Sequence, residues 1–201
     1  KKYKDVKTIT ELLRKCIRMV MTGLQQTNYP ISYLEQENIQ HEYMQLLFGK
    51  QHEKSDVFPN MFLGYQSYAL EIKHIMEPND NMKHPNIRKN YTVTDKADGD
   101  RNLLFINREG KLYMIDTNMN IIFTGSKTNE KAFFESLLDG EHIKYDKNGK
   151  FINLFAAFDI YYIKDKSTRE LPFYRSDEED AVANRRFRLD ELDNFIEKLK
   201  I

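Results

Sequence analysis

Three short segments of the sequence hold the residue types that covalent chemistry at a phosphorus atom would need. They read Lys-Ala-Asp-Gly-Asp-Arg at 96–101, Leu-Asp-Gly-Glu at 138–141 and Phe-Asp-Ile-Tyr at 158–161. A lysine amine attacks phosphorus only when it is neutral. Its reference pKa is about 10.4, so nearby positive charge such as a metal ion must lower that pKa. Each segment alone has an ordinary explanation, because Asp-Gly pairs are common in turns. Their occurrence together, and in this order, makes the set specific.

The ordered set resembles the signature of the covalent nucleotidyltransferase superfamily, which includes mRNA-capping guanylyltransferases and ATP-dependent DNA and RNA ligases. That signature consists of Lys-x-Asp-Gly, then a strand bearing Asp-Gly-Glu, then an aromatic strand with Phe-Asp. The resemblance covers roughly residues 60–190. It is greatest to the capping enzymes of large and giant DNA viruses, because of the stretches 94–101 and 115–125. Upstream, the segment 63–70 is similar to the one that precedes the lysine in capping enzymes and helps to hold the guanine.

The resemblance implies a reaction and assigns residues to it. Lys96 would attack the α-phosphate of GTP and form a covalent enzyme–GMP intermediate, and the GMP would then pass to the 5′-diphosphate end of an RNA. A divalent cation, Mg²⁺ or Mn²⁺, would neutralise triphosphate charge during the attack. Glu141 would contact the ribose or the water network of the metal, so it is also the predicted metal residue. The predicted nucleotide-binding residues are Asp98, Gly99, Arg101, Glu141, Phe158 and Gln66.

Physical chemistry accounts for several of these residue types. Glycine at position 99 would let the backbone turn so that the amine of Lys96 faces the phosphate. The rigid fork of donors on Arg101 suits contacts to the nucleotide sugar, and the ring of Phe158 would stack on the base. Asp98 would either orient local hydrogen bonds or contact the nucleotide directly.

Two other functions remain compatible with the sequence. An ATP-dependent DNA or RNA ligase shares the lysine chemistry, and Lys-x-Asp-Gly does not encode a base preference. A non-catalytic nucleotidyltransferase-like scaffold also fits, because two later family motifs are missing: an acidic-Gly-apolar strand after Phe158 and a Lys-x-Lys near the C-terminus.

Because these two motifs are missing, we interpret the chain as a fragment of a larger multifunctional capping enzyme. Triphosphatase and methyltransferase domains would be fused to it in the parent protein.

The patterning predicts an α+β fold in which helices precede an antiparallel sheet. Apolar residues recur at helical spacing over 9–24 and 34–47, and Ser32 opens a capping box before the second run. Residues 6–50 are therefore expected to form a helical hairpin whose two apolar stripes are core faces. We divide the chain into a helical N-terminal segment, 1–55, and a nucleotidyltransferase domain, 56–201. This domain is expected to have the ATP-grasp-like ligase and capping fold, incomplete at its C-terminus.

Within the domain 56–201, the hydrophobic pattern predicts the secondary structure around the later chemical segments. Residues 129–138 are interpreted as a short helix that ends at a break, Asp139-Gly140, before a short strand over 141–145. Residues 151–163 predict a long, aromatic, central strand. Ser176 and Glu179 form another capping box, and apolar residues between 187 and 199 predict a last helix.

Composition narrows the classes of protein that remain. Lysine and arginine number 31, as do aspartate and glutamate, so the formal net charge is zero and any attraction for phosphate must come from local clusters. The single cysteine, Cys16, excludes an intrachain disulfide framework and is expected to pack in a core. No apolar run approaches the roughly 20 residues of a membrane span, so no membrane partner is expected. The resemblance implies a location in the virion or in the cytoplasm of the infected host cell.

Overall fold

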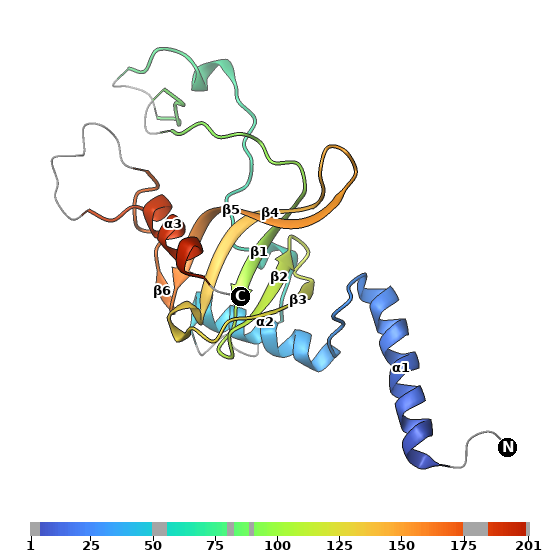
Figure 1. Cartoon of the computed structure of the whole chain (residues 1–201). Coiled ribbons are helices and arrows are strands. Elements are labelled where there is room, and N and C mark those ends of the chain that lie inside the picture. The colour runs from blue at the N-terminus through green and yellow to red at the C-terminus, as the bar shows by residue number, and fades with distance from the viewer. Residues whose placement is uncertain (1–4, 50–55, 80–82, 89–90, 175–184, 200–201) are drawn as a thin grey trace.

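We describe the fold from a computed structural model, which describes residues 5–49, 56–79, 83–88, 91–174 and 185–199. Its centre is a six-stranded antiparallel sheet with the order β3-β2-β1-β4-β5-β6 (Figure 1). The strands are β1 (Asp100–Ile106), β2 (Lys111–Asp116), β3 (Ile121–Lys127), β4 (Ser136–Tyr145), β5 (Phe151–Ile163) and β6 (Lys166–Ser167). The helices are α1 (Val6–Gln25), α2 (Tyr33–Phe48) and α3 (Arg188–Lys198), with short 3-10 helices η2 (Pro59–Met61), η3 (Ile72–His74) and η4 (Lys131–Phe133). The predicted α+β class is confirmed.

The sheet separates two hydrophobic cores. Side chains alternate between the two faces along a strand, so neighbouring residues of β1 enter different cores. Leu103 packs in a cluster with Tyr43 of α2, whereas Leu104 packs in a second cluster with Phe195 of α3. The chain is therefore layered as helix, sheet and helix, with α2 and α3 on opposite faces.

Helix α2 also fastens the segment that follows it to the sheet. The Ser32 hydroxyl accepts a 3.1 Å hydrogen bond from the Glu35 amide, so the Ser32 half of the predicted capping box is confirmed. The Glu35 side chain does not complete the box, because its Oε1 accepts from Lys111 and Tyr113 instead. The buried Tyr43 hydroxyl donates to the Met61 carbonyl at 2.9 Å and accepts from the Leu63 amide at 2.8 Å. Residues 61–63 are thereby held next to the first core. The predicted division at 55/56 falls among the undescribed residues 50–55 and stays a prediction.

Helix α1 differs from its prediction. No residue of α1 is buried, Ile17 is 54% exposed and Cys16 is exposed. In Figure 1 the helix extends away from the sheet and from α2. The expectation that its apolar stripe is a core face, with Cys16 packed inside, is therefore wrong for the described residues, and the two helices do not form a packed hairpin. Helical periodicity reveals that an apolar face exists, but not what covers it.

Two further expectations are settled around β4 and α3. The helix expected over 129–138 is wrong: only η4 is helical there, and β4 already begins at Ser136. The Asp139-Gly140 pair therefore lies inside a strand and makes no break. The last helix is confirmed as α3, while the capping box at Ser176 and Glu179 lies outside the described residues. Within the described ranges, no helix has the length and apolarity to cross a bilayer.

Candidate active site

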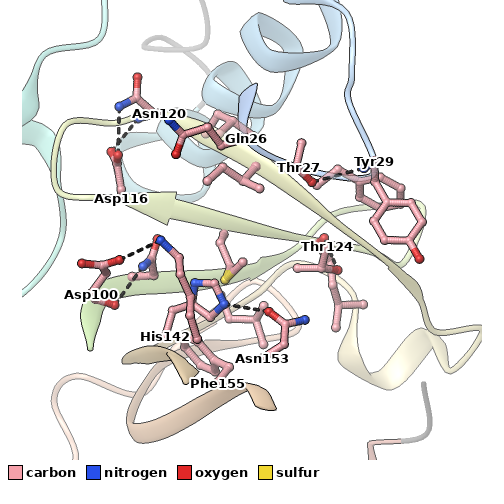
Figure 2. A pocket seen from close by; sticks show the side chains of 18 of the residues that line it. Gln26, Thr27, Tyr29, Asp100, Asp116, Asn120, Thr124, His142, Asn153 and Phe155 are labelled. Carbon is pink, nitrogen blue, oxygen red and sulfur yellow. Dashed lines mark hydrogen bonds and ion pairs between the residues drawn. The ribbon is translucent and has the colours of Figure 1, made fainter. Parts of the chain in front are cut away.

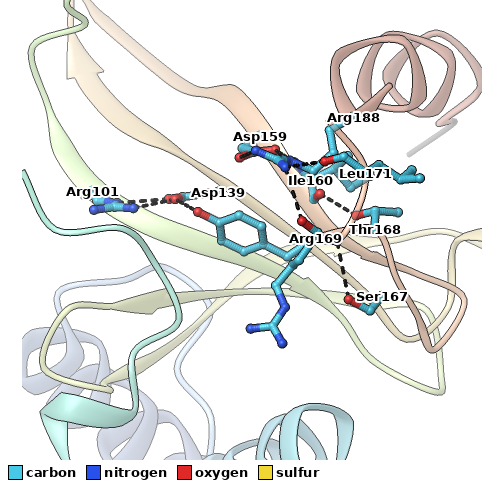
Figure 3. Close-up of polar contacts among 10 residues, drawn as sticks. Arg101, Asp139, Asp159, Ile160, Ser167, Thr168, Arg169, Leu171 and Arg188 are labelled. Carbon is cyan, nitrogen blue, oxygen red and sulfur yellow. Dashed lines mark hydrogen bonds and ion pairs between the residues drawn. The ribbon is translucent and has the colours of Figure 1, made fainter. Parts of the chain in front are cut away.

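The geometric centre of the candidate site is a charged pair between β1 and β4. Arg101 and Asp139 occupy the same face of neighbouring strands, where Arg101 is the register partner of Glu141 and Leu103 that of Asp139. Arg101 Nε donates to Asp139 Oδ1 at 3.1 Å and Nη2 donates to Oδ2 at 2.6 Å (Figure 3). The Asp139 side chain is fully buried and that of Arg101 is 27% exposed. This bidentate pair fixes the plane of the guanidinium.

A buried tyrosine completes the environment of Asp139. The Tyr161 hydroxyl on β5 donates a 2.6 Å hydrogen bond to Asp139 Oδ2. Burial, and then this hydrogen bond, raise the pKa of Tyr161 above its ordinary value, so the hydroxyl keeps its proton. The hydrogen bond with Asp139 likewise raises the pKa of Arg101. The three side chains therefore form one fixed arrangement of a donor, an anion and a cation.

Two aromatic rings and a backbone carbonyl also contact the guanidinium of Arg101. The Arg101 Cζ atom lies 5.6 Å from the ring centre of Phe62 and 5.9 Å from that of Phe158. Arg101 Nη1 donates to the Tyr65 carbonyl at 2.6 Å. The segment runs so close that a Cβ on Gly64 would lie 2.5 Å from Arg101 Nη2. Residues 62–65 therefore contact Arg101 in addition to its ion pair with Asp139.

The structure brings three of the other six sequence-predicted residues close to Arg101. Glu141 is its register partner on β4, and Phe158 contributes one of the rings. Gly99 immediately precedes β1, where a Cβ would lie 2.5 Å from the His142 carbonyl oxygen, so only glycine permits this approach without a shift of the backbone. Gln66 follows Tyr65 in the chain and is exposed.

Lys96 and Asp98 lie apart from this group, on the exposed segment that leads into β1. Lys96 Nζ donates to the Ala97 carbonyl at 3.1 Å and lies 3.8 Å from Asp98 Oδ1. The Lys96 side chain is 85% exposed, and no other described residue forms an ion pair with it. The amine is therefore open to an incoming substrate, but the structure does not place it against the guanidinium of Arg101.

A cavity lies on the opposite face of the sheet from the Arg101–Asp139 pair, because its lining residues Leu104, Met114 and Leu138 belong to the second core. It has a volume of about 1380 Å³ and lies over β1, β2 and the β4–β5 hairpin (Figure 2). Gly99 and Arg101 line it, together with His142, whose Nε2 is 2.9 Å from Asn153 Oδ1. Its wall is mixed in character, since Phe155 and the aliphatic residues of β1 and β2 alternate with polar groups.

A second buried pair anchors β5 to α3 and was not anticipated from the sequence. Arg188 Nε lies 2.9 Å from Asp159 Oδ1 and Nη2 lies 3.2 Å from Oδ2, while Nη1 donates to the Leu171 carbonyl at 2.7 Å (Figure 3). Both side chains are largely buried. Because Asp159 adjoins Phe158, this pair fixes the strand that presents the ring of Phe158 to Arg101.

The described residues offer limited protein ligands for a divalent cation. Asp139 is occupied by Arg101 and Tyr161, and within the described part of the chain no three histidine, cysteine, aspartate or glutamate side chains cluster closely enough to hold an ion. Glu141 is half-buried beside Arg101 and has no ion-pair partner among the described residues. Mg²⁺ in nucleotide sites is typically held by one or two carboxylates plus phosphates and water. A cation carried in by a triphosphate would have Glu141 as its candidate protein contact.

Sequence reasoning missed Asp139 and Tyr161 as members of the site. Both belong to the quoted segments, but Asp139-Gly140 was interpreted as a break. The available signal was the spacing, because Asp139 and Glu141 are two residues apart and in a strand would share one face.

Comparison with known proteins identifies the family. Residues 31–178 match the mRNA capping enzyme catalytic domain, so the chain belongs to that family of nucleotidyltransferases. The match spans α2 and all six strands. The chain is also 29% identical over 166 residues to a probable mRNA-capping enzyme of Acanthamoeba polyphaga mimivirus. The similar region covers 82% of this chain and 12% of that protein. The predicted resemblance to capping enzymes, including those of giant viruses, is confirmed.

Proposed function

We propose that this chain carries the nucleotide-accepting site of an mRNA guanylyltransferase, with Lys96 as the nucleophile. In the first step the neutral amine attacks the α-phosphorus of GTP, an N–P bond forms, the bond to the leaving pyrophosphate breaks and the amine loses a proton. In the second step an oxygen of the 5′-diphosphate end of an RNA attacks the same phosphorus. The N–P bond breaks and the lysine recovers its proton.

The observation that carries this proposal is the fixed position of Arg101 at the start of the strand that follows Lys96. Family membership supports nucleotide transfer in the capping class. Asp139, Tyr65 and two aromatic rings hold the guanidinium before any substrate arrives. Because the donors of Arg101 are already positioned, little ordering of this side chain remains when it meets a ribose. The exposed Lys96 segment must then fold over the bound nucleotide.

Other residues take supporting roles in the proposal. Gly99 allows the close passage of the chain beside β4, and Phe158 presents an exposed ring edge for the base. Glu141 would hold Mg²⁺ or Mn²⁺, whose charge neutralises the triphosphate. Asp98 and Gln66 lie at the rim and would contact the nucleotide once the Lys96 segment closes.

We further propose that the chain acts within a longer capping enzyme. The mimivirus relative is a far longer protein, since the aligned region covers 12% of it. Fused triphosphatase and methyltransferase activities would supply the 5′-diphosphate RNA and consume the capped product. The virion or the cytoplasm of the infected host cell is the proposed location.

A covalent labelling experiment on the full-length protein tests the proposal. The protein is incubated with α-labelled GTP, and separately with α-labelled ATP, in the presence of Mg²⁺ or Mn²⁺, and is then denatured. We expect an adduct from GTP that survives denaturation and is lost in Lys96→Ala. The matched control is Lys131→Ala, which removes another exposed lysine, in η4, and should leave labelling intact.

The other outcomes separate the alternatives. Labelling from ATP in place of GTP would identify a ligase. The absence of any adduct in the full-length protein would overturn the proposal in favour of a scaffold. Equal labelling of wild-type protein and Lys96→Ala would show that another residue is the nucleophile.

A further inference from the structure

The hairpin that joins β4 to β5 extends beyond the rest of the sheet. The pairing of β1 with β4 reaches only to His142, whereas β4 and β5 continue to pair as far as Tyr145 and Phe151 (Figure 1). Among the described residues, 143–154 therefore form a two-stranded ribbon with no third strand beside it. A ribbon of this kind gains little from packing, so its side chains are candidates for an external partner.

The ribbon exposes aromatic and aliphatic side chains. Tyr145 is 59% and Phe151 is 61% exposed, and their ring centres lie 5.6 Å apart in an edge-to-face arrangement. Leu154 is also about half exposed. Two adjacent exposed aromatic rings on a fixed backbone provide the faces on which unpaired bases stack.

Positive charge surrounds these rings. The segment 142–154 contains Lys144, Lys147 and Lys150 against a single acidic residue, Asp146. Lys144 pairs with Asp100 at 3.0 Å, but Lys147 and Lys150 have no ion-pair partner among the described residues. Asp146 Oδ1 accepts hydrogen bonds from the Asn148 and Lys150 amides at 2.8 and 2.9 Å, so the turn that carries both lysines has a defined shape. Lysines beside exposed aromatic rings suit a single-stranded polyanion.

The base of the ribbon is the candidate active site. Glu141 is the register partner of Arg101, and Tyr145 lies four residues further along β4. At the rise of a β-strand this separation is about 13 Å. A register shift separates Ile143 from Tyr145 in the pairing of β4 with β5, and Tyr145 and Phe151 line the same cavity as His142 and Arg101. A strand of nucleic acid held on the ribbon would thus have its end within one or two nucleotides of Arg101.

We propose that the β4–β5 hairpin binds the 5′-terminal nucleotides of the single-stranded acceptor RNA, with bases stacked on Tyr145 and Phe151 and phosphates beside Lys147 and Lys150. This inference rests on the proposed function, because that function supplies the RNA acceptor. The hairpin then determines how the RNA end is directed toward the nucleotide on Lys96.

Binding of a labelled oligoribonucleotide tests this directly. A fluorescent single-stranded RNA with a 5′-diphosphate is titrated with the 201-residue chain, and the anisotropy is followed between about 50 and about 200 mM salt. We expect Tyr145→Ala and Phe151→Ala each to weaken binding by about 5- to 100-fold. The double variant Lys147→Glu, Lys150→Glu should weaken binding and reduce its salt dependence. Tyr145→Phe and Lys131→Glu are the matched controls and should bind like the wild type.

A second measurement separates this proposal from the proposed function. The same hairpin variants, in the full-length protein, are assayed for the GMP adduct and for transfer of GMP to RNA. We expect adduct formation to be unchanged and transfer to be reduced. Unchanged RNA affinity in the aromatic and lysine variants would overturn the hairpin proposal. If no GMP adduct forms in any variant the proposed function fails, but the RNA affinities still decide the role of the hairpin. If an aromatic variant disrupts the ribbon, the variant with Lys147→Glu and Lys150→Glu still tests the proposal, because both lysines are exposed.

Discussion

The Tyr161 hydroxyl donates its hydrogen bond to the same carboxylate oxygen of Asp139 that receives Nη2 of Arg101, both at 2.6 Å. One buried oxygen thus joins β5 to β1 through β4. The position of Arg101 therefore also depends on Tyr161, a residue two strands away that bonds to the same carboxylate oxygen. Asp139 and Tyr161 are therefore positioning residues for Arg101.

Loss of Asp139 should be more harmful than loss of the tyrosine hydroxyl. Asp139→Asn removes the anion that compensates the guanidinium and should lower the free energy of unfolding by about 3 kcal/mol. Tyr161→Phe removes one hydrogen bond to a charged group, with an expected loss of about 1 to 2 kcal/mol. Urea denaturation of the two variants measures both values. An equal or larger loss for Tyr161→Phe would contradict the central place of Asp139.

Two arginines near the start of α3 should behave differently when truncated. Arg188→Ala leaves Asp159 buried without its partner and should cost about 3 kcal/mol of stability. Arg186 lies 2.6 Å from Glu191 but is 61% exposed, so Arg186→Ala should change stability by less than about 0.5 kcal/mol. Thermal unfolding followed by circular dichroism compares them. Similar losses in both variants would show that the Asp159 pair does not stabilise the packing of α3.

The two N-terminal helices provide a matched pair of isoleucines. Ile39 of α2 is 2% exposed and Ile17 of α1 is 54% exposed. Ile39→Ala should destabilise the fold by about 3 kcal/mol, because it opens a cavity in the first core. Ile17→Ala should have an effect below about 0.5 kcal/mol. A large loss for Ile17→Ala, measured by chemical denaturation, would mean that α1 packs on the domain in solution.

Glu42 should give stability a pH dependence of its own. Burial raises the pKa of Glu42 above its ordinary value of 4.5, although the Arg108 amide hydrogen bond opposes this shift. The folded state thus binds this proton more tightly than the unfolded state. The resulting stability is complete below about pH 4.5 and is lost as the pH rises through the raised pKa. Glu42→Gln, which keeps an oxygen acceptor for Arg108, should raise the melting temperature at pH 7.

The difference between Glu42→Gln and wild type should shrink as the pH falls toward 4. Melting temperatures measured across pH 4 to 7 would reveal the trend. Glu37→Gln, at an exposed position on the same helix, is the charge-matched control and should give a smaller effect at pH 7. A difference for Glu42→Gln that grows toward acid would reverse the assigned sign.

Most of the candidate site was chosen through the resemblance to capping enzymes that the three chemical segments carry. That resemblance selected Arg101, Gly99, Glu141 and Phe158, and the fold places the other three near the guanidinium of Arg101. The sheet register and the close approach of the chain at Gly99 account for this proximity. Their chemical roles, and that of Lys96, remain predictions.

Other features depended on contacts between distant parts of the chain. The sequence by itself determined that β-rich segments follow two helices, that the second helix is capped at Ser32 and that a lysine precedes Asp-Gly and an arginine. Only the tertiary structure decided that Asp139 continues a strand beneath Arg101, that Asp159 meets Arg188 and that the apolar face of α1 stays uncovered. The physical reason is that burial and ion pairing depend on which segments meet in space. The sheet joins residues that are far apart in the chain, such as Arg101 and Asp139, which are 38 positions apart.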